Sequence, residues 1–374
     1  MIVKNARNKT KKLLRKAFLK KGSDKFKDIC EAHKNEWVPL STEEMRKYRK
    51  NQYIYTLYKN FELMNKALDG NDEPVDLSKY LTPKQYKCEI LARLNKLDHT
   101  VIGTGFLSIL VEKNYFPILF PEFVHPKIFV RRIKGVLYDG DFNRINEETA
   151  LSICSERDAL VFKISRDSKQ GKGVKRVERA DYKQMLSDYG NNFIVQDLIK
   201  QHENFAYFND SSVNIIRILS MFWRGTVYIL CSKLRVGAPG TFTDLGVSEL
   251  CPLEIGVNDD GTFFSKAHEL AKDYKIYDNA FGKPIIGHVP NYEKMKELVI
   301  KAHSRYPDYG ILGWDLTLDE DGNIVFIEVN SRAPSIEYSQ CIFGPFFSML
   351  SKDGSPLKDE IMNEPIDLSD MNAF

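Results

Sequence analysis

The chain has 374 residues, of which 43% are hydrophobic and 28% charged, and its net charge is +3. These values are ordinary for a globular protein, and the length allows two or three sub-domains with cores of their own. No stretch approaches the roughly 20 apolar residues that a helix needs to cross a membrane. The six cysteines are scattered, which predicts neither a zinc site nor a disulfide framework, so we expect a reducing, cytoplasmic compartment.

The chain begins with a basic segment. Residues 1–27 contain eleven Lys or Arg and one acid, a local charge of +10, and they lack the apolar core and cleavage site of a signal peptide. Their apolar residues recur at roughly helical spacing, so we predict a basic amphipathic arm over residues 1–30. The arm could lie on an anionic membrane at its inner face, bind nucleic acid or remain a solvated tail. Nucleic acid is the partner that we disfavour.

Residues 31–125 predict a mainly helical N-terminal domain. Ser41 and Glu44 form a capping-box pattern, and Pro83 suits the first turn of a further helix. The "GTG" at Gly103–Gly105 lacks a third glycine and a preceding strand, so it does not indicate a dinucleotide site.

The middle and end of the chain predict strands mixed with helices. The runs "KIFVRRIKGVLYDG", "ALVFKIS" and "NFIVQDLI" are typical of strands. Two hairpins follow, one about a Trp-Arg-Gly turn and one, "ILGWDLTLDEDGNIVFIEVN", after a helix at about 291–304. Strands in hairpins favour the α+β class over regular βαβ winding. We expect sub-domains at residues 126–200 and 201–374.

The second hairpin carries two carboxylates whose convergence depends on strand register. With a four-residue loop, Asp319–Gly322, Asp315 would face the same side as Glu328 and Asn330. A five-residue loop would place Asp315 on the opposite face. Simple alternation also predicts that Ile324, Phe326, Glu328 and Asn330 share one face.

Converging oxygens from Asp315, Glu328 and Asn330 would suit Mg²⁺, which shares its coordination with nucleotide phosphates. The alternative is an edge strand with ordinary polar residues facing solvent. Apolar residues flank both strands and imply burial, and buried carboxylates need a cation or hydrogen bonds. We therefore favour the metal site, with Arg332 nearby as a cation.

Basic side chains earlier in the chain could bind the polyanion that such a metal accompanies. Lys163 lies within a predicted strand, and the following loop contains Gly171 and Gly173, whose backbone could cradle phosphate. Asn214 and Arg217 are three apart, so only one of them should face the site. Arg235, at the end of the next strand, is a further cation.

These segments together resemble a known fold. Read in order, "EKNYF", "LVFKIS", "SKQGKG", "IVQDLI", "SVNIIRI" and "GWDLTLDEDGNIVFIEVNSR" resemble the ATP-grasp fold. More narrowly, "QDLIKQHENF", "SVNIIRILS" and "LRVGAPGTFTD" resemble the sugar-transfer-associated ATP-grasp family. The resemblance covers about residues 112–340 and implies two α+β sub-domains that grip ATP, after a mainly helical region.

The resemblance also implies roles for single residues. Lys113 and Lys163 would contact the phosphates of ATP, and the loop with Gly171 and Gly173 would close over them. The adenine would lie against Gln196, Asp197, Leu198 and Ile199. One or two Mg²⁺ ions would be held by Asp315, Glu328 and Asn330, while Arg217, Arg235 and Arg332 would be the catalytic cations.

The implied activity is an ATP- and Mg²⁺-dependent carboxylate–amine ligase that forms an amide through an acyl phosphate. Its partners would be a small-molecule or glycan carboxylate and an amine acceptor, within a sugar or cell-envelope (capsular polysaccharide) precursor. Arg235, Asp244 and His202 are candidates for the acceptor pocket. Two alternatives stay open: a kinase that phosphorylates a hydroxyl, and a membrane-associated protein with a degenerate nucleotide fold.

Overall fold

A computed structural model describes residues 109–166, 173–245, 250–269, 275–331, 336–346, 349 and 357–363. The predicted basic arm and the predicted helices before residue 109 lie outside these residues. The described residues fall into two compact units. One contains the described residues between 109 and 331, and the other contains α12 (Ile336–Phe343) and α14 (Leu357–Asn363).

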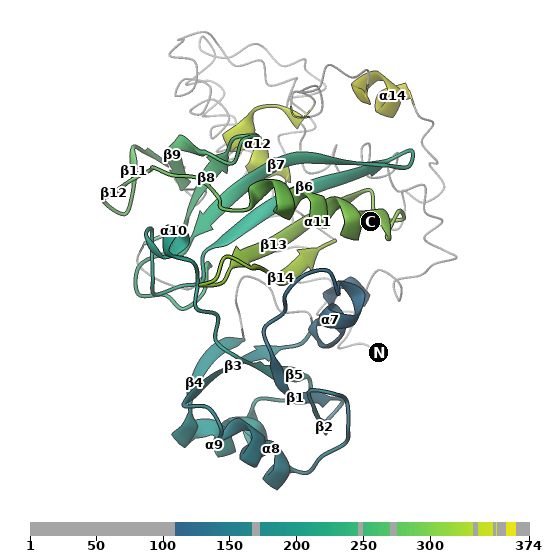
Figure 1. Ribbon diagram of the computed structural model, residues 1–374, viewed down its shortest axis with the longest axis vertical. Helices are drawn as coiled ribbons and strands as arrows, with labels where there is room; N and C mark the ends of the chain where they lie inside the picture. Colours follow the sequence, from purple (N-terminus) through teal and green to yellow (C-terminus); the bar gives the residue numbers. More distant parts are fainter. Residues whose placement is uncertain are drawn as a thin grey trace, which may run out of the picture. The chain divides into compact units, whose positions relative to one another are not determined.

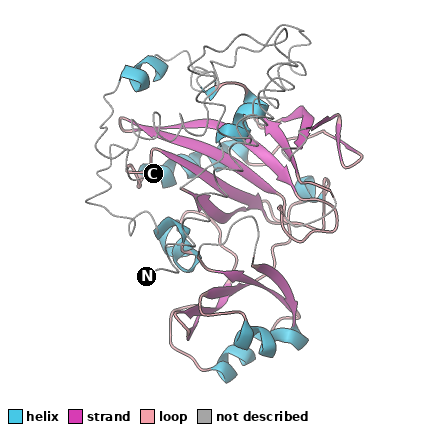
Figure 2. Ribbon diagram, turned by 180° about the vertical axis from the view of Figure 1, so that it is seen from behind, coloured by secondary structure: helices cyan, strands magenta, loops and turns pink. Residues whose placement is uncertain are grey.

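The larger unit begins with short helical turns and a five-stranded antiparallel sheet, which we call the small sheet. The turns are η3 (Ile109–Val111), η4 (Lys113–Tyr115) and α7 (Phe116–Leu119). The strands are β1 (Ile128–Ile133), β2 (Val136–Asp139), β3 (Ala159–Ile164), β4 (Val174–Glu178) and β5 (Phe193–Gln196), in the order β2-β1-β5-β3-β4. Figure 2 shows the helices α8 (Glu147–Cys154) and α9 (Tyr182–Asp188) packed on this sheet, with η5 (Arg179–Asp181) before α9.

A second, seven-stranded sheet forms the rest of this unit, and we call it the large sheet (Figure 1). Its strands are β6 (Ile215–Trp223), β7 (Thr226–Val236), β8 (Leu253–Val257), β9 (Phe263–Glu269), β10 (Lys275–Tyr277), β13 (Ile311–Leu318) and β14 (Ile324–Asn330). They lie in the order β10-β9-β8-β7-β6-β13-β14, and each neighbouring pair is antiparallel. The remaining elements are α10 (Glu203–Ala206), the hairpin β11 (Asn279–Ala280) and β12 (Lys283–Pro284), and α11 (Tyr292–Ser304).

The two predicted hairpins and the predicted helix are present, so the α+β class is confirmed. The β6–β7 turn contains Arg224 and Gly225, both with positive φ (45° and 89°), as in the type I′ turns that match strand twist. The α11 helix packs against β6 and β7.

Alternation along the strands gives the large sheet two unlike faces. One face is apolar and packs with α11 into the main hydrophobic core, to which Ile216, Ile218, Leu316 and Trp314 belong. Residues on the other face of the same strands include Arg217 and Asp315, which are almost fully buried. We call this second face the charged face, and it holds the candidate site.

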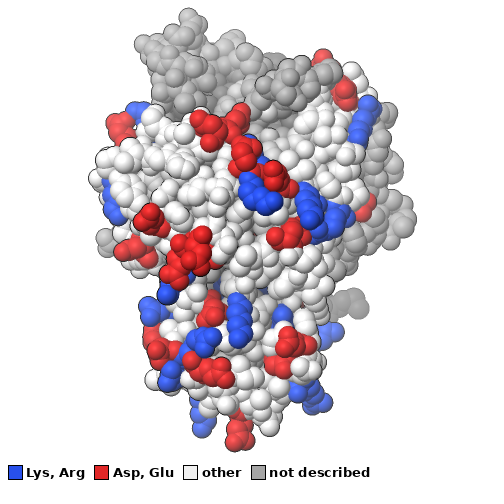
Figure 3. All heavy atoms as spheres, in the orientation of Figure 1, with Lys and Arg blue, Asp and Glu red and all other residues white. Residues whose placement is uncertain are grey.

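In the described part of the chain, no helix has the length and apolar character that a bilayer crossing requires. On the face drawn in Figure 3, basic and acidic side chains of the described residues are interspersed. That face does not present the continuous basic stripe typical of nucleic-acid binding.

A buried chain of hydrogen bonds crosses the core beneath the large sheet. The Trp314 indole N–H donates to Ser220 Oγ (2.7 Å), and Ser220 Oγ lies 2.7 Å from His303 Nδ1. His303 Nε2 lies 2.6 Å from the Tyr309 carbonyl, which can only accept. Nε2 therefore carries a proton, and burial, which lowers the pKa of His303 to about 4, favours the neutral ring.

We expect Ser220→Ala to lower the free energy of unfolding by about 2–4 kcal/mol. The substitution removes the acceptor of the Trp314 indole and the donor to His303, and each buried group left unpaired costs about 1–3 kcal/mol. Thermal or denaturant unfolding measures the change. Ser304→Ala, which removes an exposed hydroxyl on α11, is the control and should change stability by less than about 0.5 kcal/mol. Equal effects of the two variants would contradict this account of the buried chain.

Candidate active site

Four neighbouring strands bring acidic and basic side chains together on the charged face. Glu328 on β14 lies directly across from Asp315 on β13, and Asp315 lies directly across from Arg217 on β6. Lys233 on β7 continues the row beside Arg217. Cross-strand partners have neighbouring side chains on one face of a sheet, so these four groups form a continuous line of charge.

The convergence of Asp315 and Glu328 depends on a β-bulge that the sequence does not reveal. Leu318 pairs with Ile324, which leaves the five-residue loop that should have separated the carboxylates. The register then shifts between Asp315 and Leu316, because Leu316 pairs with Phe326 while Asp315 pairs with Glu328. The extra residue, Ile327, restores the alignment of the two carboxylates.

The same bulge corrects the predicted shared face of β14. Ile324 and Phe326 belong to the apolar core with Trp314, whereas Glu328 lies across from Asp315 on the charged face. The prediction of one face for all four residues was wrong because simple alternation does not hold across a bulge.

A buried ion pair fixes the central carboxylate. Two nitrogens of the Arg217 guanidinium face Asp315: Nε donates to Oδ1, and Nη2 donates to Oδ2 at 2.7 Å. Arg217 is 4% and Asp315 2% exposed, so water cannot compensate either charge. The forked contact therefore sets the direction of the Asp315 carboxylate.

Asn330 completes the oxygen-bearing cluster. Its side-chain amide nitrogen lies 3.3 Å from Asp315 Oδ2 and 3.5 Å from Glu328 Oε1. The amide oxygen and nitrogen can exchange places by rotation, so the group can equally present oxygen to a cation. Burial and the neighbouring charge of Asp315 raise the pKa of Glu328, which is the environment that a divalent cation would relieve. The donor set fits Mg²⁺, although no three His, Cys, Asp or Glu side chains gather in the part of the chain that the structure describes.

Two lysines lie beside this cluster. Lys113 Nζ is 3.7 Å from Glu328 Oε2. Lys163, on β3 of the small sheet, lines the same small pocket as Lys113 and Ile327. Burial and the charge of Lys113 lower the pKa of Lys163 to about 8, partly offset by Glu328. The pocket thus gathers two cationic groups at the acidic end of the charged face.

The predicted adenine segment borders this pocket at one residue. Gln196 ends β5, is 7% exposed and lines the pocket with both lysines. Asp197 donates its N–H to the Lys127 carbonyl (3.0 Å) and pairs with Arg157 at 3.5 Å. Leu198 and Ile199 follow without regular structure and are half-buried. Their contact with adenine stays a prediction.

The glycine loop and one arginine fall largely outside the described residues. Gly171 and Arg332 are among the residues that the structure does not describe. Gly173 is described, and its carbonyl accepts from Ile164 N–H (3.0 Å), which joins it to β3. Its φ is +74°, and a Cβ there would lie 2.4 Å from Ile164 Cδ1, so glycine is needed for the turn into β4.

Arg235 takes part in a buried network instead of standing open to a ligand. It donates to Asp244 (2.7 Å) and to Glu254 (3.1 Å), and Glu254 also accepts from Lys233 (2.6 Å). Lys233 is fully buried and Arg235 is 6% exposed. The two cations lower the pKa of Glu254 to about 2 against the effect of burial, whereas burial raises the pKa of Asp244. The carboxylate of Asp244, 18% exposed, is the most open group of this network.

Sequence analysis missed Lys233 and Glu254. The available signal was the one used for Lys163: a lysine inside an apolar run, here "ILCSKLRV", needs a buried partner. The sequence could not identify that partner, because Glu254 lies on β8 and the pairing of β7 with β8 follows a long connection.

Two other candidates have structural contacts. Asn214 is fully buried and donates to the carbonyls of Phe205 (2.8 Å) and Asn209 (2.6 Å), so Arg217, not Asn214, faces the site. His202 is the N-cap of α10, where Nδ1 accepts from Asn204 N–H at 3.1 Å. That contact accounts for His202 without a substrate.

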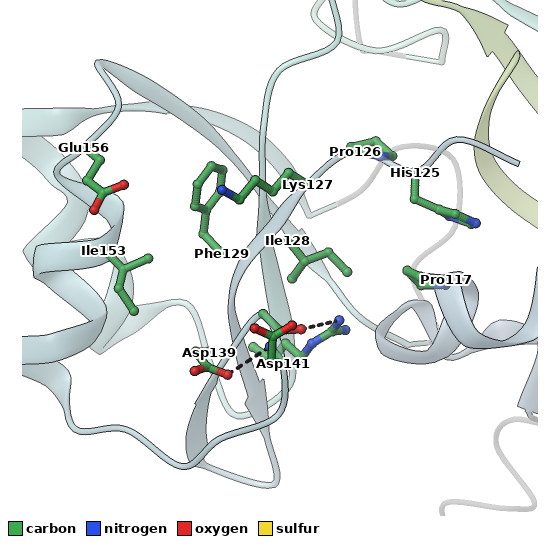
Figure 4. A pocket seen from close by; sticks show the side chains of 12 residues that line it. Pro117, His125, Pro126, Lys127, Ile128, Phe129, Asp139, Asp141, Ile153 and Glu156 are labelled. Carbon is green, nitrogen blue, oxygen red and sulfur yellow. Dashed lines mark hydrogen bonds between the residues drawn. The ribbon is translucent and has the colours of Figure 1, made fainter. Parts of the chain in front are cut away.

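A larger cavity of about 410 Å³ adjoins the small pocket, with which it shares Pro117, His125 and Pro126 (Figure 4). Its lining mixes prolines and apolar residues with charged ones, and none of the predicted site residues is among them. The lining residues are Pro117, His125, Pro126, Lys127, Ile128, Phe129, Arg131, Asp139, Gly140, Asp141, Ile153 and Glu156. In Figure 4 the Asp139 carboxylate accepts from the backbone of Asp141 and so belongs to its own turn.

Comparison with protein families gave a match over more than half of the chain. The model of the family described as sugar-transfer associated ATP-grasp matches residues 141–347. This match confirms the predicted ATP-grasp fold. A comparison with curated proteins gave no match.

Solved structures with similar folds include three enzymes of low sequence identity. The D-Ala:D-Ser ligase VanG from Enterococcus faecalis is 15% identical, with a TM-score of 0.34, and the match covers 59% of this chain and 52% of that one. An L-amino acid ligase from Bacillus licheniformis is 13% identical, with a TM-score of 0.37, and the match covers 69% of this chain and 51% of that one. A biotin carboxylase from Campylobacter jejuni is 13% identical, with a TM-score of 0.40, and the match covers 65% of this chain and 46% of that one. The match thus spans about half the length of these proteins.

We expect Arg217→Met to destabilise the protein by about 3–5 kcal/mol, because it leaves the buried carboxylate of Asp315 without its cation. The double variant Arg217→Met/Asp315→Asn should recover part of the loss, since the uncompensated charge is gone. Denaturant unfolding of the four proteins of this cycle measures the coupling.

The control is an exposed ion pair. Arg179 and Asp158 are 2.6 Å apart with side chains 52% and 94% exposed, so Arg179→Met should cost less than about 1 kcal/mol. A loss of similar size in Arg179→Met and Arg217→Met would contradict the assigned importance of the buried pair.

Proposed function

This chain belongs to the sugar-transfer associated ATP-grasp family, and we propose that it is an ATP- and Mg²⁺-dependent ligase that joins a carboxylate to an amine. The observation that carries the proposal is the meeting of two carboxylates, an amide and two lysines at one end of the charged face. Metal and phosphate ligands are needed together for phosphoryl transfer.

Each group has a role in this proposal. Asp315, Glu328 and Asn330 would hold one or two Mg²⁺ ions, and Arg217 would orient Asp315 through its forked contact. Lys113 and Lys163 would bind the phosphates of ATP, and Gln196 would border the adenine. Bound Mg²⁺ would neutralise negative charge on the group being transferred.

The proposed reaction has two steps. The carboxylate of the substrate attacks the γ-phosphorus of ATP, with release of ADP, and becomes an acyl phosphate. The amine then attacks the acyl carbon, phosphate leaves, and the amide remains. The chain's own contribution is to place the carboxylate in line with the phosphate and to stabilise charge with preorganised cations.

The predicted substrate class and location accompany this proposal. The family description, sugar-transfer associated, supports a carboxylate or amine on a sugar or cell-envelope polysaccharide precursor. We further propose a cytoplasmic protein whose segment 1–27 touches an anionic membrane. Arg332 and Arg235 stay candidates for stabilising the transferred group.

The ligase reaction can be tested without the natural amine. With ATP, Mg²⁺ and a panel of sugar and small-molecule carboxylates, hydroxylamine should trap the acyl phosphate as a hydroxamate, with one ADP per hydroxamate. Colorimetric detection of hydroxamate and coupled detection of ADP measure both products. If no acid gave a hydroxamate and a stable phosphorylated product formed instead, the protein would be a kinase and not a ligase.

Glu328→Gln is the matched variant for this assay. It keeps the shape of the side chain and removes the charge, so we expect hydroxamate formation to fall at least about 100-fold, as when a charge-stabilising group is lost. Glu320→Gln, on the exposed hairpin loop, is the control and should retain full activity. Unchanged turnover in Glu328→Gln would remove Glu328 from the metal site.

The affinity for ATP should depend on pH through Lys163. The pKa of Lys163 is about 8 in the free protein, so its ammonium is present below pH 8 and is lost as the pH rises. We expect the Kd for ATP to roughly double between pH 7 and pH 8 and to rise by up to tenfold per unit above it. Calorimetric titration measures this. Lys163→Arg, whose charge persists throughout, should abolish the rise, and a rise of the same size in that variant would exclude Lys163 as its source.

A further inference from the structure

The two lysines of the proposed phosphate site come from segments 50 positions apart. Lys163 is fixed within β3, but Lys113 lies in the short turn η4, outside both sheets. The charge of Lys113 lowers the pKa of Lys163, which means that the two ammonium groups repel each other. The Lys113 side chain meets Glu328 at 3.7 Å, and separate interactions hold the backbone of its turn beside the end of β3.

The residue before Lys113 supplies one such interaction. Glu112 is 7% exposed, and its Oε2 lies 2.8 Å from Nε of Arg166. The two groups form an ion pair, but the Nε–H does not point at the oxygen and makes no hydrogen bond with it. Its other oxygen, Oε1, accepts from the Asn114 side chain (2.8 Å) and from the Asn114 N–H (3.3 Å). Glu112 thus caps the turn and joins it to Arg166.

Arg166 is the second residue after β3, the strand that carries Lys163. The backbone continues this connection, because the Lys113 N–H donates to the carbonyl of Ser165 at 2.9 Å. On the other side of the turn, the buried guanidinium of Arg131 on β1 donates to the carbonyl of Asn114. Glu112 and Lys113 are therefore tied to the two residues that follow β3, and Asn114 is tied to β1.

We propose that Glu112 and Arg166 are positioning residues that hold the Lys113 ammonium at a fixed place relative to Lys163, so that both meet the phosphates of ATP. The inference rests on the proposed function, since it takes ATP as the ligand of the two lysines. Glu112 and Arg166 act through Lys113 and do not touch the nucleotide. The site is then preorganised by the protein before ATP arrives.

The test compares ATP with adenosine, which lacks the phosphates. With Mg²⁺ present, Glu112→Gln should raise the Kd for ATP about tenfold, the loss expected for one charge-assisted contact. The Kd for adenosine, measured by NMR titration, should not change. Glutamine keeps the acceptor for Asn114 and removes only the charge that faces Arg166.

A double-mutant cycle separates positioning from general support of the fold. Lys113→Met should weaken ATP binding by itself, and Glu112→Gln added to it should cause no further loss. Arg166→Gln removes the other member of the same ion pair and should reproduce the effect of Glu112→Gln. Because Arg166 is half-exposed, its substitution should disturb the fold less. Glu147→Gln breaks an ion pair with Arg132 in the same sheet and should leave both affinities unchanged.

Several results would overturn the inference. They are an unchanged ATP affinity in both Glu112→Gln and Arg166→Gln, an equal loss for ATP and adenosine, and a full further loss in the Lys113→Met background. If the wild-type protein bound adenosine but gained nothing from the phosphates, the proposed function and this inference would both be wrong. Normal ATP binding with insensitive variants would overturn this inference alone.

Discussion

The buried contact between Arg217 and Asp315 is the constraint on which the rest of the site depends. Two charges removed from water are tolerable only if each meets the other, and their cross-strand pairing on β6 and β13 provides that geometry. Because Arg217 occupies one side of the Asp315 carboxylate, its remaining lone pairs point toward β14. Glu328 lies there, and with Asn330 it makes a second acidic group that the single arginine cannot neutralise. The half-buried charge of Glu328, which meets Lys113 at 3.7 Å, supports the proposed cation site, whereas the opposite face of the sheet packs into the core.

The charged face places two acidic neighbours, Glu328 and Asp315, beside two basic ones, Arg217 and Lys233, and is therefore not a pool of cations. Arg217 and Lys233 are neighbours across β6 and β7, and each has its own carboxylate, Asp315 and Glu254. Arg235 continues the pattern between Glu254 and Asp244. Pairing of this kind compensates the buried ions, and it leaves Glu328 and Asp244, at the two ends, as the more exposed carboxylates. In the proposed acceptor pocket, the Asp244 carboxylate would favour a cationic group of the substrate over an anionic one. Arg235 would not attract an anionic group, because it already has two acidic partners.

Much of this arrangement could be predicted from the sequence. The parts that could not be predicted were missed for one shared reason. Alternation identified the hairpins, and the apolar surroundings of Lys163, Asp315 and Glu328 indicated charges that need partners. The bulge at Ile327 could not be found, since one extra residue in a strand changes no local pattern yet reverses which face Glu328 occupies. The partner of Lys233 was hidden for a related reason: strand order, not spacing, places Glu254 beside it. Long-range pairing is the information that composition and periodicity lack.

The same reasoning explains why the bulge lies where it does. A five-residue loop lets Asp319 close the turn, where its carboxylate accepts from the N–H groups of Asp321 (3.1 Å) and Asn323 (2.8 Å). That loop alone would set Asp315 against an apolar residue and put Glu328 into the core, where its charge would have no partner. Ile327 resolves the conflict between a well-formed turn and a functional carboxylate at the cost of one unpaired ladder position. The turn, the bulge and the acidic pair are therefore a single local solution, and a change in the length of either the loop or the strand would separate Glu328 from Asp315.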